Sequence, residues 1–215
     1  MKFSSIFSVF LAGLAVASPL GQPPSSEDLA IREADIEIES SLVTRAGTDK
    51  ISAEYNKVHA AKTTIANGKY YAFTIKWPLG DGTSIDKETP AEIQELQKNL
   101  GFKHIGVILG KVKDVEAGKG KNKHQEKDFT GQLFHLIKKS DGSAELDSPR
   151  NYKLSGTTAG LFKNGQLTFV KEISAKTFSD AKKNAEAYFD VAEHKKYSVD
   201  NNNCDSFVKA FETKL

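Results

Sequence analysis

Cys204 is the only cysteine in this chain of 215 residues, so it cannot form a disulfide within the chain. A lone thiol is either buried and inert, joined to a second chain, or used as a nucleophile. The residue type alone leaves these three roles open. A cysteine nucleophile forms a thioester with a carbonyl substrate and needs a neighbouring base, so the surroundings of Cys204 and the histidines of the chain bear on the choice.

The segment around Cys204 predicts a helix whose first turn contains the cysteine. Asn203 is a favourable N-cap residue, and the apolar spacing of Phe207, Val208 and Phe211 is helical. Backbone N–H groups and the helix dipole at such a position lower a thiol pKa and can hold the oxyanion of a tetrahedral intermediate. Phe207 and Val208 share a helix face with Cys204, so an inert thiol pointing into the core is the competing interpretation.

Two of the five histidines lie in segments that predict β-strands. His104 begins the apolar run 104–110, and His135 lies within the apolar run 129–137. Neighbouring antiparallel strands can place both imidazoles on one face, within reach of a thiol. The alternative for each is a hydrogen-bonded structural histidine. We expect the remaining three histidines to be solvated surface residues: His59, His124 and His194.

Three short motifs give the chain a resemblance to a known group of enzymes. They are His104-Ile-Gly-Val-Ile-Leu-Gly in one strand, Leu133-Phe-His-Leu in a second, and Tyr197-Ser-Val-Asp-Asn-Asn-Asn-Cys-Asp-Ser-Phe-Val leading into the last helix. Over residues 100–212 the chain resembles the circularly permuted papain-like thiol enzymes. These include the lecithin:retinol acyltransferase-like (LRAT-like) branch of the NlpC/P60 superfamily and the related PPPDE isopeptidases.

The resemblance implies a catalytic site and a reaction. It makes Cys204 the nucleophile, His104 the base and His135 the residue that orients the base. A thioester would form from an amide or ester and be resolved by water or a second acceptor, without metal or cofactor. Members of the group act on peptide or isopeptide amides, cell-wall peptides and lipid esters, so the substrate stays open. A secreted, non-catalytic binding or effector-like protein on the same scaffold is the alternative function.

Other segments predict the elements that must position these side chains. Helices are expected from Ser52 to Gly68, from Pro90 to Gly101 and from Phe178 to Val191. Strands are expected over 69–77, 104–112 and 129–137, and Asn164-Gly165 predicts a β-hairpin whose second strand is 167–173. This mixed order predicts an α+β domain with a largely antiparallel β-sheet flanked by helices. The resemblance implies the permuted papain-like fold, with the cysteine on a C-terminal helix.

The composition is that of a globular domain, with 39% hydrophobic and 27% charged residues. A formal net charge of +2 is too small to indicate a nucleic-acid partner. The lysine-rich segment from Lys111 to Lys127 is typical of a solvated loop, and weak contact with an anionic surface is its alternative role. We expect a monomer acting on a peptide, cell-wall or lipid substrate.

The N-terminal residues carry targeting signals. Lys2, an apolar run over 6–16 and the small residues Ala15 and Ala17 predict a secretory signal peptide over 1–17, with a signal anchor as the alternative. Residues 18–45 are acidic and lack aromatic residues, which predicts a disordered pro-segment removed after Arg45, or else a linker. Residues 46–215 then form a single α+β domain of a secreted, extracellular protein.

Overall fold

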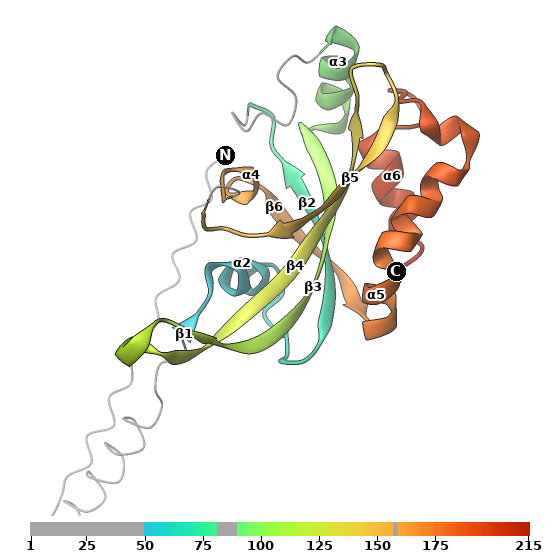
Figure 1. Ribbon diagram of the computed structural model, residues 1–215. Coiled ribbons are helices and arrows are strands. Elements are labelled where there is room, and N and C mark those ends of the chain that lie inside the picture. Colours follow the sequence, from blue (N-terminus) through green and yellow to red (C-terminus); the bar gives the residue numbers. More distant parts are fainter. Residues whose placement is uncertain (1–49, 81–89, 157–158) are drawn as a thin grey trace, which may run out of the picture. The chain divides into compact units, whose positions relative to one another are not determined.

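A computed structural model describes residues 50–80, 90–156 and 159–215 (Figure 1). Residues Thr48–Leu215 form one compact unit. The predicted signal peptide over 1–17 and the predicted acidic segment over 18–45 lie outside the described residues, so both stay predictions. No helix among the described residues is long and apolar enough to cross a membrane.

The described residues form a six-stranded mixed β-sheet, which confirms the α+β class. Its strands are β1 (Lys50–Ile51), β2 (Tyr70–Trp77), β3 (His104–Ala117), β4 (His124–Lys138), β5 (Ala144–Tyr152) and β6 (Gln166–Ile173). The strand order is β1-β4-β3-β2-β6, and β5 also pairs with β4. The pairing is antiparallel throughout except between β1 and β4, which are parallel.

Helices cover both faces of this sheet. They are α2 (Ala53–Ala61), α3 (Ala91–Leu100), α4 (Ala159–Phe162), α5 (Ala175–Glu186) and α6 (Cys204–Glu212), with 3₁₀ turns η1 (Gly120–Asn122), η2 (Ala187–Asp190) and η3 (Ala192–Lys195). The helices α5 and α6 lie on one face of the sheet, and α2 and α4 lie on the other (Figure 1). Helix α3 lies at the end of the sheet where β3 begins (Figure 1).

Alternating side chains of the central strands supply two hydrophobic cores. On one face, Val107 and Leu109 of β3 pack with Phe207 of α6. On the other face, Ile108 of β3 packs with Val58 of α2. Since successive strand residues point to opposite faces, one apolar strand serves both cores, which explains why β3 reads as a nearly continuous hydrophobic run.

Three expected elements were wrong. Asn164-Gly165 does not close a β-hairpin, because the residues before it form α4 and β6 pairs with β2 instead. The buried Phe162 ring packs against Tyr152 at a centroid distance of 5.0 Å, and this tertiary contact outweighs the local turn signal. The helix expected from Phe178 to Val191 ends at Glu186 and continues as the η2 turn, and the helix expected from Ser52 to Gly68 ends at Ala61.

The segment from Lys111 to Lys127 is also not a loop. Pairing between β3 and β4 continues from Lys111↔Thr130 to Ala117↔His124, so the two strands extend as a ribbon and only residues 118–123 turn. Opposite charges face each other along the ribbon, as in Lys113↔Asp128, and such cross-strand pairs support strands that lack an apolar face.

We predict that Gly110→Ala destabilises the domain by about 2 kcal/mol or more, because a Cβ there would overlap the Phe129 ring and lie 2.7 Å from Thr130 O and from Gly131 Cα. The backbone of β4 cannot yield as a flexible side chain would. Gly160→Ala, where a Cβ meets nothing within 4 Å, is the control and should leave stability nearly unchanged. Urea unfolding of both variants measures the effect, and equal stabilities would contradict the packing argument.

Candidate active site

Cys204 occupies the first turn of α6, as its neighbours predict. The Asn203 side chain caps the helix by accepting hydrogen bonds from the N–H groups of Asp205 and Ser206, at 3.0 and 3.1 Å. Ser206 Oγ accepts a hydrogen bond from Asn203 N–H and completes a capping box. Asn203 Nδ2 also donates to Val199 O, so the residues before the helix are fixed to its start.

The thiol itself is buried, with 6% of Cys204 exposed, and it belongs to the same core as Phe207, Val208 and Phe211. Burial raises the pKa of the Cys204 thiol to about 11, although the backbone N–H groups of Ile105 and Asp205 act in the opposite direction. The expectation of a lowered pKa was therefore wrong, because desolvation outweighs the helix N-terminus here. The resting protein holds a neutral thiol.

The two strand histidines meet where β3 and β4 stop pairing. The ladder between the strands ends at Val107↔Phe134, and His104 and His135 lie just beyond it. His104 Nε2 and His135 Nδ1 are 2.8 Å apart in a buried hydrogen bond. A Cβ at Gly106 would come within 3.1 Å of His135 Cβ, so the glycine leaves room for the second imidazole.

Asp147 completes this arrangement, and sequence reasoning missed it. It lies directly opposite His135 in the pairing of β4 with β5, and its Oδ2 accepts a hydrogen bond from His135 Nε2 at 3.0 Å. Arg150 Nε lies 2.6 Å from the same carboxylate oxygen. The hydrogen bond from His135 lowers the pKa of Asp147, so the carboxylate is ionised at neutral pH.

A signal for Asp147 was present in the sequence. Asp141-Gly142 is a strong turn dipeptide, and the observed hairpin around it pairs Lys138 with Ala144. Counting three residues back from Lys138 and three forward from Ala144 pairs His135 with Asp147.

The chain of hydrogen bonds fixes the tautomers of both imidazoles. The Asp147 carboxylate only accepts, so the proton of neutral His135 is on Nε2 and its Nδ1 is an acceptor. His104 must then donate through Nε2, which leaves Nδ1 of His104 unprotonated. His104 is thus held as a base with a defined free nitrogen.

Burial favours the neutral form of this base. Desolvation lowers the pKa of His104 well below its ordinary value, and the neighbouring His135 and Lys103 act in the same direction. The imidazole also lies beside the Trp77 ring at a centroid distance of 5.4 Å. His104 is therefore neutral at physiological pH, with an unprotonated nitrogen.

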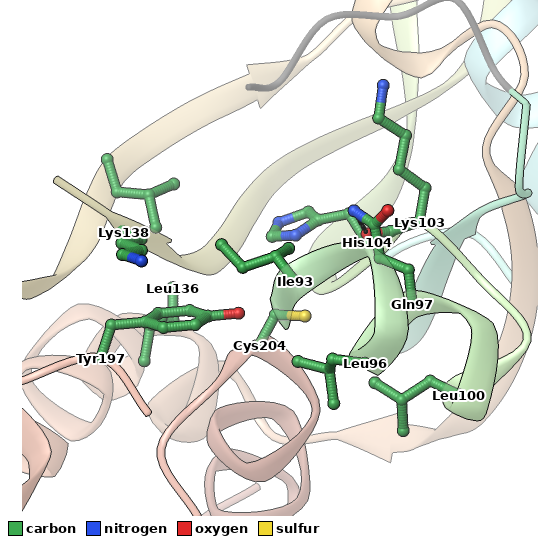
Figure 2. Close-up of a pocket in the computed structure, with 11 residues that line it drawn as sticks. Ile93, Leu96, Gln97, Leu100, Lys103, His104, Leu136, Lys138, Tyr197 and Cys204 are labelled. Atoms are coloured by element: carbon green, nitrogen blue, oxygen red, sulfur yellow. Dashed lines mark hydrogen bonds between the residues drawn. The ribbon is translucent and has the colours of Figure 1, made fainter. Parts of the chain in front are cut away.

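His104 and Cys204 line one small pocket of about 20 Å³, enough for one water molecule (Figure 2). Helix α3 contributes Ile93, Leu96 and Leu100 to its wall. Cys204 and His104 share this pocket, but the structure shows no hydrogen bond between the thiol and the imidazole. Catalytic hydrogen bonds often tighten only when substrate is bound.

The other three histidines contribute nothing to this pocket. His59 and His124 are partly exposed, as expected. His194 is also partly exposed, although its ring stacks on Tyr188 at 3.9 Å and its Nδ1 lies 2.7 Å from Tyr188 O.

No protein-family model, curated protein or solved structure matches the chain. Among the described residues, no group of histidine, cysteine, aspartate and glutamate side chains is arranged to hold a metal ion. A thiol and an oriented imidazole at one pocket are the groups that proton transfer and nucleophilic attack on a carbonyl require.

We predict that alkylation of Cys204 by iodoacetamide shows no plateau up to pH 10 and rises about tenfold per pH unit, because the thiolate reacts and burial raises the thiol pKa to about 11. In urea, the unfolded chain should instead titrate near its ordinary value of about 8.5. Rate constants from intact mass measure both curves. A folded-state midpoint below the unfolded one would contradict the dominance of desolvation.

Proposed function

We propose that this protein is a cysteine-dependent hydrolase or acyltransferase that cleaves an amide or ester bond through a thioester, on a permuted papain-like fold. One observation carries the proposal: the hydrogen-bonded series Asp147, His135 and His104 leaves an unprotonated nitrogen at the base, whose imidazole lines the same pocket as the only cysteine. A purely structural histidine pair does not require this ordering of acceptor, donor and base.

The first half-reaction starts from neutral partners. Cys204 Sγ attacks the carbonyl carbon while His104 Nδ1 takes the thiol proton, so that an S–C bond forms and the carbonyl oxygen becomes an oxyanion. The resulting imidazolium is stabilised through His135 by the charge of Asp147. When the intermediate collapses, the bond to the leaving nitrogen or oxygen breaks, and His104 returns the proton to that atom.

The second half-reaction regenerates the enzyme. Water, or an alcohol or amine acceptor, gives its proton to His104 and attacks the thioester carbon. The C–S bond breaks, and the sulfur leaves as the thiol when it recovers the proton from His104. Water gives hydrolysis, whereas another acceptor gives acyl transfer.

The substrate must displace part of the pocket wall. Ile93, Leu96 and Leu100 of α3 close a space that holds only one water, which is too small for a carbonyl substrate. Ile93 is the only one of the three that is buried, and the Glu92 side chain of α3 forms a partly exposed ion pair with Lys138 at 3.0 Å. Exposed ion pairs stabilise weakly, so substrate binding can shift α3 at modest cost.

The alternative function is a non-catalytic secreted binding or effector-like protein, and one observation favours it. The Cys204 thiol is packed with Phe207, Val208 and Phe211 in the core, as an inert cysteine would be. The two functions differ in whether Cys204 becomes acylated. Secretion and a weak anionic-surface contact by the β3–β4 ribbon are further parts of the proposal. The apolar run within residues 1–17 supports the first, and the ribbon's lysines support the second. A monomeric state is proposed as well.

We predict that the protein forms an acetyl-enzyme on Cys204 when mixed with p-nitrophenyl acetate, a small activated ester. Cys204→Ser and Cys204→Ala should keep the fold and lose this reaction, because the first replaces only sulfur by oxygen and the second removes the nucleophilic atom. Intact mass and peptide mapping detect the acetyl group, and circular dichroism checks the fold. Acetylation of wild type at lysines alone, with Cys204 unmodified, would favour the non-catalytic alternative.

The two histidines should differ in the size of their effects. His104→Ala should slow acylation by about 10²- to 10⁴-fold, because it removes the proton acceptor. His135→Asn and His135→Gln, which can still hydrogen-bond an imidazole, should keep more activity than His135→Ala. Burst kinetics with the same ester compare the variants. If all three His135 variants acylate like wild type while stability falls, His135 is a structural histidine and the proposed ordering of the base is wrong.

A further inference from the structure

A groove with a volume of about 340 Å³ lies between β5, α5 and the turns η2 and η3. None of the residues that line it also lines the Cys204 pocket. Sites for small molecules have volumes of about 300–1,000 Å³. The groove is therefore large enough to bind a small ligand at a place separate from the proposed reaction.

Apolar side chains that belong to the core beneath α6 line part of this groove. Ala144 and Leu146 are two residues apart on β5, so their side chains point to the same face of the sheet. Leu146 lies opposite Leu136 in the pairing with β4, and the Phe189 ring of η2 packs against Tyr188 at a centroid distance of 5.2 Å. Because the core holds these side chains, the apolar surface is in place before a ligand binds.

The charged side chains of the groove leave one lysine without an ion-pair partner. Glu186 pairs with Lys182 at 3.7 Å, and both line the groove. Glu145 lines it as well and pairs with Lys139, which lies outside it. Lys195, the remaining charged residue of the lining, is exposed and forms no ion pair with any described residue. The groove therefore has a net positive charge that favours an anionic ligand.

The backbone next to Lys195 is fixed against the start of β5. Lys196 forms a β-bridge with Ser143, and its carbonyl oxygen accepts a hydrogen bond from Asn202 Nδ2 at 2.7 Å. The Asn202 side chain also donates to His194 O at 2.8 Å, so the residues on both sides of Lys195 are held. The lysine thus extends from a fixed point of the backbone beside the groove.

A protein strand is a poor occupant for this groove. Among the described strands only β4 pairs with β5, so the outer edge of β5 carries no further strand. Pro149 lies on β5 and lines the groove. Proline has no backbone N–H, and on an edge strand it disfavours pairing with another chain. These features favour a small molecule over an added strand.

We propose that this groove binds a small carboxylic acid that carries an apolar chain. The chain lies against Leu146 and Phe189, and the carboxylate forms an ion pair with Lys195 Nζ. Apolar contact supplies most of the affinity, because an exposed ion pair stabilises weakly, and the lysine makes the site selective for an acid. The inference goes beyond the proposed function and does not depend on it.

The test compares octanoate with octan-1-ol, which has the same chain length and no charge. Titration of the ¹⁵N-labelled protein with octanoate should shift the amide resonances of Ala144 to Leu146 and of Lys182 to Phe189 until they saturate. Octan-1-ol should bind the same residues more weakly. Lys195→Ala should weaken octanoate binding by about fivefold, the scale of one exposed ion pair, and leave octan-1-ol binding unchanged. Lys183→Ala is the matched control and should change neither, because Lys183 is an exposed lysine of α5 that does not line the groove.

Several results would overturn the inference. One is the absence of saturable shifts, and another is a set of shifts confined to the Cys204 pocket or to the β3–β4 ribbon. Equal affinities for octanoate and octan-1-ol, or unchanged octanoate binding in Lys195→Ala, would remove the role of the lysine and the selectivity for an acid. Shifts of the groove amides when the unliganded protein is concentrated would assign the groove to a second copy of the chain instead. Acetylation of Cys204 by p-nitrophenyl acetate tests the proposed function separately from all of these.

Discussion

The buried hydrogen bond between His104 and His135 is the interaction on which the rest of the site depends. It lies just beyond the last backbone pair of β3 and β4. A hydrogen bond between two side chains therefore joins the strands where their backbones no longer pair. An imidazole buried there without a partner would cost free energy, and a pair of imidazoles alone leaves the tautomers undefined. The third strand, β5, resolves this by placing Asp147 opposite His135. Three consecutive strands therefore determine the protonation state of one nitrogen.

Two opposing electrostatic effects set the pKa of the Cys204 thiol. The N-terminus of α6 and the N–H of Ile105 favour the thiolate, while burial in the core that contains Phe207 disfavours it more strongly. The lowered pKa of His104 acts in the same sense, because it disfavours the imidazolium. A charged pair is therefore absent at rest and would form only as charge moves to the substrate. A buried neutral thiol is protected from chance oxidation and alkylation, and under the proposed function a substrate must open the pocket to reach it.

Sequence patterns predicted the residues of the site better than the contacts between them. Asn203 as a cap placed Cys204 on the first helical turn, and apolar runs placed His104 and His135 in strands, all of which the structure shows. Strand β5 was missed because its composition, with Glu145, Asp147 and Arg150, lacks the apolar alternation of a buried strand. Burial of the thiol depends on how α6 docks on the sheet, and local patterns do not contain that information.

The spacing of the site along the chain has a consequence for the order of folding. His104 and His135 are 31 residues apart and His135 and Asp147 are 12 apart, and both pairs are joined by hairpin connections between consecutive strands. Cys204 comes from a helix that must close a much longer loop, and long-range contacts form later because loop closure costs more entropy. A partly folded chain can therefore hold an oriented base while the nucleophile is still undocked. Under the proposed function, reactivity would then begin only with the last tertiary contact, because an incompletely folded chain would not bring Cys204 to His104.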